Sequence, residues 1–215
     1  MSYPVRPITI EEKEALYDKY APCPFHTAKA DISGCCIKLY TLSDSTKDMW
    51  EDNFYSMSEA VRSHGRVICL DDPNRPLEAL YEPATKTAFL FNFDYYGWIK
   101  SVALAIAGDI LEDEHQIYSV HGAALDMDGR GVTLIAPSKT GKTTHSWGLL
   151  RSKDARLVTD DWYYVRLSER RPVAFGSEKN CYIDADIGTI WEEYRGLVER
   201  AKLDNRKRAV VNVRW

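Results

Sequence analysis

The segment 136–144, APSKTGKTT, constrains the fold of this chain more than any other segment. An apolar, strand-like stretch at 132–135 precedes it, and a helix-like segment follows it. In a turn between a strand and a helix, backbone N–H groups converge on one point, and the helix N-terminus adds partial positive charge. A lysine in the position of Lys142 reaches terminal phosphates, and a hydroxyl in the position of Thr143 can bind magnesium. The segment therefore predicts a phosphate-binding loop for a nucleotide triphosphate.

The residues expected to hold the nucleotide are Ser138, Lys139, Thr140, Gly141, Lys142, Thr143 and Thr144. The loop departs from the usual pattern at Ala136, which replaces the first glycine, and at Pro137 and Lys139, which restrict the backbone. Lys139 either adds a second cation for phosphate or points to solvent. The alternative is an ordinary link between a strand and a helix, with Lys142 exposed.

Composition excludes several classes of partner. The chain has 215 residues, enough for one globular domain, or for one domain with a small N-terminal subdomain. Its 32 acidic and 28 basic residues do not favour nucleic acid or an anionic membrane as a partner. No signal-peptide pattern and no apolar run of ~18 residues is present, so we expect a cytoplasmic protein. The five cysteines have no paired spacing, which predicts reduced and mainly buried thiols.

We expect residues 1–97 to form an N-terminal α+β subdomain. Thr9 and Glu12 have the spacing of a capping box, which opens a helix over 10–20. Strand-like stretches follow at 36–42, 66–70, 77–81 and 87–93, with a helix at 49–62 between the first two.

We expect residues 98–215 to form an α/β nucleotide-binding core with a mixed sheet. A buried helix begins at Trp98, and two strands at 118–126 and 131–135 form a hairpin whose second arm leads into the loop. A short strand at 156–159 and a hairpin at 162–175 come next. An amphipathic helix at 187–201 and an apolar, strand-like end at 209–215 complete the core. Because the chain stops inside an apolar strand, we expect the core to be truncated at its C-terminus.

Two carboxylates and one histidine are the candidates for chemistry beside the loop. Asp160 and Asp161 close an apolar strand eighteen residues after Lys142, where a metal-binding carboxylate is expected beside a phosphate loop. One could face magnesium and the other an acceptor hydroxyl, whereas the alternative is an exposed acidic turn. His121 lies on the strand before the hairpin turn; a lone histidine there is most often a packed residue. Gly122 after it indicates close approach of another group.

The order of these motifs resembles the catalytic domain of HPr kinase/phosphorylase. The resemblance rests on SVHG at 119–122, then a hairpin, the loop, and LVTDD at 157–161. The loop itself is more similar to that of ATP-dependent phosphoenolpyruvate carboxykinase, whose S-x-T-G-K-T-T core matches 138–144. The E-x-x-C-Y pattern of that enzyme matches 178–182. Both families belong to one superfamily, and the resemblance covers about 119–182.

The resemblance implies roles for single residues. Asp160 would be the base for the acceptor hydroxyl, Asp161 would help Thr143 to hold magnesium, and His121 would lie at the phosphate-transfer site with Lys142. Glu178 would lie near the metal, although a solvated loop acid is an equal alternative. The implied cofactors are ATP, or another nucleotide triphosphate, and Mg²⁺.

The expected function is a magnesium-ATP-dependent kinase that acts on a hydroxyl of a small molecule or of a protein serine. Phosphoenolpyruvate carboxykinase is much longer than this chain, and HPr kinase/phosphorylase uses a later basic loop to reach its protein substrate, so neither specific activity transfers. Two alternatives stay open: a carboxykinase-like lyase and a non-catalytic nucleotide-sensing module. The resemblance also implies a homo-oligomer.

Overall fold

The computed structural model describes residues 5–137, 140–169, 171–204 and 206–212. The chain is mixed α/β, as expected, and it divides into two compact units, Met1–His115 and Gln116–Trp215. This division falls later than the expected one between residues 97 and 98. The reason is α3 (Tyr96–His115), which packs against β3, β5 and β7 of the first unit instead of joining the loop-bearing half.

The first unit is built on a mixed seven-stranded sheet with the order β1-β6-β7-β5-β3-β2-β4. Its parallel pairs are β1 with β6, β3 with β5 and β5 with β7, and the other pairs are antiparallel. The strands are β1 Val5–Pro7, β2 His26–Ile32, β3 Cys35–Thr41, β4 Tyr55–Ser56, β5 Gly65–Leu70, β6 Glu78–Glu82 and β7 Thr87–Phe91.

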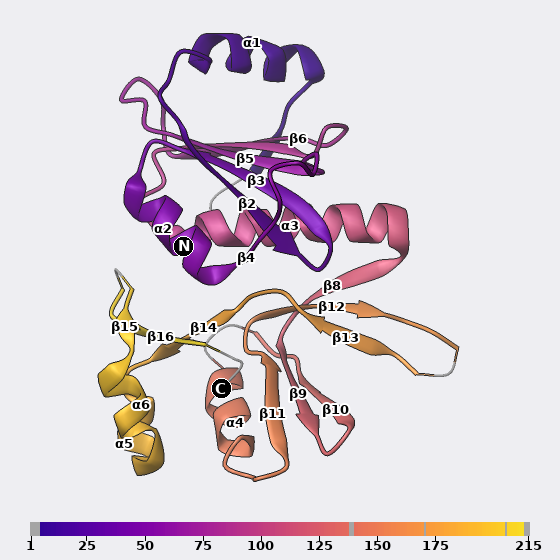
Figure 1. Ribbon diagram of the computed structural model, residues 1–215, viewed down its shortest axis with the longest axis vertical. Helices are drawn as coiled ribbons and strands as arrows, with labels where there is room; N and C mark the ends of the chain where they lie inside the picture. Colours follow the sequence, from indigo (N-terminus) through magenta and orange to yellow (C-terminus); the bar gives the residue numbers. More distant parts are fainter. Residues whose placement is uncertain (1–4, 138–139, 170, 205, 213–215) are drawn as a thin grey trace. The chain divides into compact units, whose positions relative to one another are not determined.

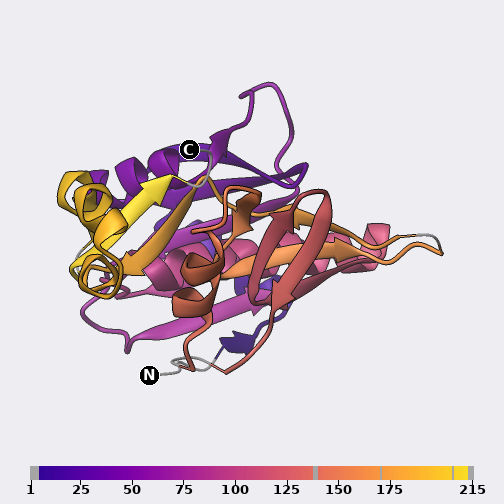
Figure 2. The same cartoon turned by 90° about the horizontal axis from the view of Figure 1, so that it is seen from below.

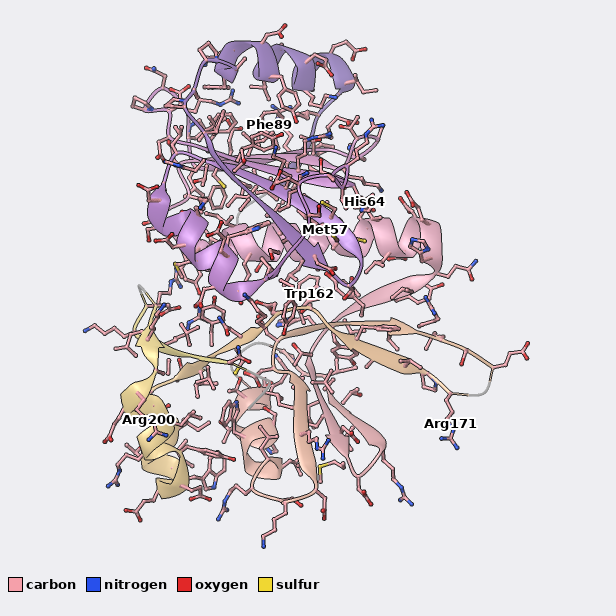
Figure 3. All side chains as sticks on the ribbon, in the orientation of Figure 1. Met57, His64, Phe89, Trp162, Arg171 and Arg200 are labelled. Atoms are coloured by element: carbon pink, nitrogen blue, oxygen red, sulfur yellow. The ribbon has the colours of Figure 1, made fainter. Side chains whose placement is uncertain are left out.

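Helices cover both faces of this sheet (Figure 1). On one face α1 (Ile10–Tyr20) begins at the predicted capping box, in which Thr9 and Glu12 bond each other's backbone N–H groups. It packs on a cluster of strand residues that includes Phe89, which lies between α1 and the sheet in Figure 3. On the other face lie α3 and α2 (Asp44–Asn53). The helix predicted at 49–62 was misplaced, because Ser43 caps an earlier start.

In its described residues, the second unit contains three sheets of three strands, with the orders β10-β9-β11, β13-β12-β8 and β14-β16-β15. All the strand pairs in these sheets are antiparallel. The strands are β8 Ile117–His121, β9 Ala123–Met127, β10 Arg130–Leu134, β11 Ala155–Thr159, β12 Trp162–Arg166, β13 Val173–Gly176, β14 Asn180–Asp184, β15 Lys202–Leu203 and β16 Arg208–Asn212. The hairpin of β12 and β13 extends beyond the rest of this unit (Figure 2), and Arg171 points outward near its tip (Figure 3).

The helices of the second unit are short. They are α4 Lys142–Leu149, α5 Ile187–Ile190, the 3-10 helix η1 Glu192–Tyr194 and α6 Arg195–Arg200. The single amphipathic helix predicted at 187–201 is therefore interrupted, because Trp191 has an extended backbone with φ −130° and ψ 114°. Its apolar residues still share one cluster with Trp147 of α4 and with β14 and β16.

Within the described residues, the helices are too short or too polar for a bilayer crossing.

Candidate functional site

Three segments of the second unit meet at one edge of the β10-β9-β11 sheet. Strands β10 and β11 both run antiparallel to β9, so they run in the same direction and their C-terminal ends share an edge. The segment 136–144, called the loop below, follows β10 there, and Asp160 follows β11. His121 and Gly122 lie at the same edge, because β9 starts directly after them. The topology thus brings the predicted loop, histidine and carboxylates together.

This edge is also where the chain changes from one sheet to another. Strand β8 pairs with β12, and strand β9 pairs with β11. The chain therefore crosses between these two sheets twice, once at Gly122 and once at Asp160 and Asp161. The backbone N–H of Gly122 donates to Asp161 O at 3.0 Å, and a bulge interrupts β11 just before the carboxylates. Bulges beside a site re-aim side chains. The strand pairing is therefore irregular directly before the two carboxylates.

Gly122 has no room for a side chain. A Cβ atom at this position would lie 2.7 Å from Leu134 O, at the end of β10. This confirms the close approach predicted from the sequence, and the approaching group is the backbone that leads into the loop. Gly122 thereby brings the start of the loop against the crossing that carries Asp161.

The loop ends in a left-handed residue, Gly141 with φ 93° and ψ 15°, which precedes the first turn of α4. Lys142 bends back over the loop, and its Nζ donates to Ala136 O at 2.8 Å and to Pro137 O at 3.2 Å. Thr140 Oγ1 donates to Pro137 O at 2.6 Å. The backbone N–H groups at the start of α4 have no helical partner and are available to an anion.

Of the other residues predicted to hold phosphate, Thr143 is half-buried and Thr144 is exposed on the first turn of α4. Ser138 and Lys139 lie outside the described residues, so their predicted contacts stay predictions.

The other end of α4 is fixed by aromatic packing. Tyr194 Oη donates to Trp147 O at 2.8 Å, and the two rings meet edge to face with centroids 5.0 Å apart. The Trp147 side chain is buried in the cluster formed with β14 and β16. This packing holds α4 in place, and with it the N-terminus of the helix.

Asp160 and Asp161 are neighbours with different surroundings. Asp160 is only 6% exposed, and its Oδ1 accepts a hydrogen bond of 2.8 Å from the Ser146 hydroxyl of α4. The Asp161 side chain is 54% exposed, and its Oδ1 lies 3.1 Å from Nε2 of His121. Asp160 is thus directed toward the loop helix, and Asp161 lies open to solvent beside a histidine.

The His121 side chain is half exposed, so it does not lie in the core. It pairs with Trp162 across the β8–β12 ladder, and the two rings are stacked at 27° with centroids 6.2 Å apart. When Nε2 carries the proton, the imidazole donates to Asp161 and orients that carboxylate.

Glu178 lies in the link between β13 and β14 and is partly buried. The neighbouring Ser177 donates through its hydroxyl to Trp162 O at 2.6 Å. Because Trp162 follows Asp161 directly, this bond brings the backbone at Glu178 close to the same edge as the two aspartates.

The donor set at this edge is compatible with a magnesium ion. In the described part of the chain, no three His, Cys, Asp or Glu side chains converge on one point. Magnesium bound beside nucleotides usually takes one or two carboxylates and keeps several waters and phosphate oxygens as ligands. The Asp160 carboxylate, which Ser146 of α4 bonds, and the Thr143 hydroxyl on the first turn of the same helix are candidate oxygen donors of this kind.

Sequence reasoning missed Ser146. It lies three residues after Thr143 on α4, is fully buried, and bonds the first of the two aspartates. No signal in the sequence marks it, because its burial and its bond depend on the approach of β11 to α4.

No protein-family model matches the chain, and its sequence matches no curated protein.

Proposed function

We propose that the second unit binds magnesium-ATP at the loop and transfers the γ-phosphoryl group to a hydroxyl of a small molecule or of a protein serine. The observation that carries this proposal is the convergence, at one sheet edge, of the loop, the Asp160–Asp161 pair and His121. A phosphoryl-transfer site needs an anion-binding loop, a carboxylate for the metal and a group that orients the nucleophile.

The chain's own groups divide the work of binding and orientation. The α4 N-terminus and the Lys142 ammonium bind the β- and γ-phosphates once Nζ leaves Ala136 O and Pro137 O. Thr143 and Asp160 would hold magnesium, which neutralises charge on the phosphates when it is bound. Burial and the Ser146 bond direct Asp160 toward α4, which suits a metal-side carboxylate.

Asp161 is the better candidate for the group that receives the acceptor. A general base must come within hydrogen-bond distance of the hydroxyl that it deprotonates, and Asp161 is the accessible carboxylate of the two. In the transfer, the bond between the γ-phosphorus and the bridging oxygen breaks, and a bond to the acceptor oxygen forms. The hydroxyl proton passes to Asp161, held by His121, and ADP leaves. This division reverses the roles that the resemblance implies for the two aspartates.

The test combines ATP binding and phosphoryl transfer on the full chain. Binding is measured by calorimetry with and without magnesium, and transfer is measured with γ-labelled ATP and a panel of hydroxyl-bearing metabolites and serine-containing proteins. Lys142→Ala should weaken ATP binding by about 10-fold or more, because it removes a charge-assisted contact to phosphate. Lys153→Ala, an exposed lysine after α4, is the matched control and should bind as the wild type does.

The aspartate variants separate the two roles. Asp161→Asn should retain magnesium-ATP affinity and lose transfer by roughly 100-fold or more, within the usual contribution of a general base. Asp160→Asn should reduce the gain in ATP affinity that magnesium provides. Tight ATP binding with no transfer to any acceptor would favour a nucleotide-sensing module, and nucleotide consumption that depends on oxaloacetate would favour a lyase.

A further inference from the structure

Ser146 is the one buried hydroxyl that bridges the loop helix and the Asp160 carboxylate in the described residues. Its side chain is fully buried, and its Oγ lies 2.8 Å from Asp160 Oδ1 and 3.0 Å from Thr143 O. Asp160 closes β11 and Thr143 belongs to the first turn of α4, so one hydroxyl spans the two segments proposed to hold magnesium.

The Ser146 hydroxyl can donate to only one of its two neighbours, the Asp160 carboxylate or the Thr143 carbonyl. A serine hydroxyl has one proton to donate, and an ionised carboxylate can only accept. The Thr143 carbonyl lies inside α4, where the regular partner is the backbone N–H four residues later. The Ser146 proton is therefore available to Asp160, and a hydrogen bond to a charged acceptor is about twice as strong as a neutral one.

We infer that Ser146 is a positioning residue for magnesium: it holds the Asp160 carboxylate against α4, whose first turn carries Thr143. This inference rests on the proposed function. Ser146 itself touches neither metal nor nucleotide, and it acts by fixing the direction of a ligand, as outer-shell partners of metal ligands do.

A merely structural role makes a different prediction. If Ser146 only filled space and satisfied a buried group, its removal would lower the thermal stability and would affect ATP binding equally with and without magnesium. If it positions Asp160, ATP binding without magnesium stays intact and only the contribution of magnesium falls.

The experiment titrates Mg²⁺ against ATP binding in Ser146→Ala and in the wild type. The expected result is an increase of about 10- to 100-fold in the half-saturating magnesium concentration, the usual loss for an outer-shell partner. ATP affinity measured in chelator should equal that of the wild type. Thr87→Val is the matched control, since it removes a fully buried hydroxyl of the first unit, which bonds Thr85 O instead of a carboxylate.

Ser146→Cys keeps the side-chain volume but donates weakly, so it should fold and show the same magnesium defect even where the alanine variant does not fold. An unchanged magnesium titration in either folded variant would overturn the inference, as would equal losses of ATP affinity with and without magnesium. A wild-type chain that binds no ATP at all would instead overturn the proposed function, so the two failures are distinguishable.

Discussion

Replacing Gly122 with alanine tests the geometry that joins the loop to the crossing at Asp161. The added Cβ would lie 2.7 Å from Leu134 O, 3.3 Å from Ile135 Cγ1 and 3.4 Å from Tyr163 Cε1. Side-chain rotation can relieve the second and third contacts. The first involves backbone, so β10 must move by several tenths of an ångström away from the crossing.

Forcing a methyl group into a packed site of this kind costs about 1–3 kcal/mol. For a unit of about 100 residues, each kcal/mol lowers Tm by roughly 4–8 °C, so we expect a decrease of roughly 4–24 °C in the unfolding transition of the second unit. The assay is differential scanning calorimetry of the full chain. Because the displaced backbone leads directly into the loop, ATP affinity should fall in the same variant.

Gly131→Ala is the matched control. Gly131 lies on β10 too, but an added Cβ would have nothing within 4 Å, and its φ is not in the left-handed region. This variant should unfold and bind ATP as the wild type does. Equal Tm values for Gly122→Ala, Gly131→Ala and the wild type would refute the argument that Gly122 is required by close backbone approach.

Two further predictions concern the cysteines and Asp72. Burial raises the pKa of the Cys35 thiol to about 11. The other cysteines are buried too, except Cys23. A thiol reagent at pH 8 should therefore modify Cys23 quickly and reach all five cysteines only after denaturation, and fast modification of two or more thiols in the folded chain would contradict the buried positions. The Tyr20 hydroxyl and a neighbouring lysine bond the Asp72 carboxylate, and these contacts hold its pKa well below its ordinary value. Because the folded-state pKa is depressed, this stabilisation is present at neutral pH and is lost as the pH falls below about 4. Asp72→Asn should thus be less stable than the wild type at pH 7 in urea unfolding and approach it at acidic pH, and a constant difference over that range would count against the pairing.

The sequence predicted best those features that depend on neighbouring residues. The Thr9 capping box, the β9–β10 hairpin and the strand that ends directly before Asp160 are set by local spacing and turn chemistry, and all three are present. The close approach predicted at Gly122 was also confirmed. A glycine inside a strand-like segment indicates by itself that another group leaves no room for a side chain.

What the sequence did not show depends on contacts between distant segments. The periodicity of 187–201 predicted one helix, but packing against Trp147 and Tyr194 accommodates three short pieces around an extended Trp191. Nothing in the sequence of α3 indicates which of the two units it belongs to. Ser146 carries no motif, and only the approach of β11 to α4 reveals its bond to Asp160.

The same holds for the roles of the two aspartates. Adjacent carboxylates at a strand end are equivalent by pattern, and only burial distinguishes Asp160, which faces α4, from the exposed Asp161. The resemblance to kinases of the HPr type implied an assignment, whereas the accessibility of the side chains favours the opposite one.

Transfer of the γ-phosphoryl group is the most direct test of the central claim that the loop, Asp160, Asp161 and His121 form one phosphoryl-transfer site. The measurement follows label from γ-labelled ATP into the acceptor panel with magnesium present, for the wild type and for Asp161→Asn. We expect labelled product with the wild type, and magnesium-ATP binding without product for Asp161→Asn. Equal transfer by the two proteins, or a wild type that neither binds nor consumes ATP, would contradict the claim.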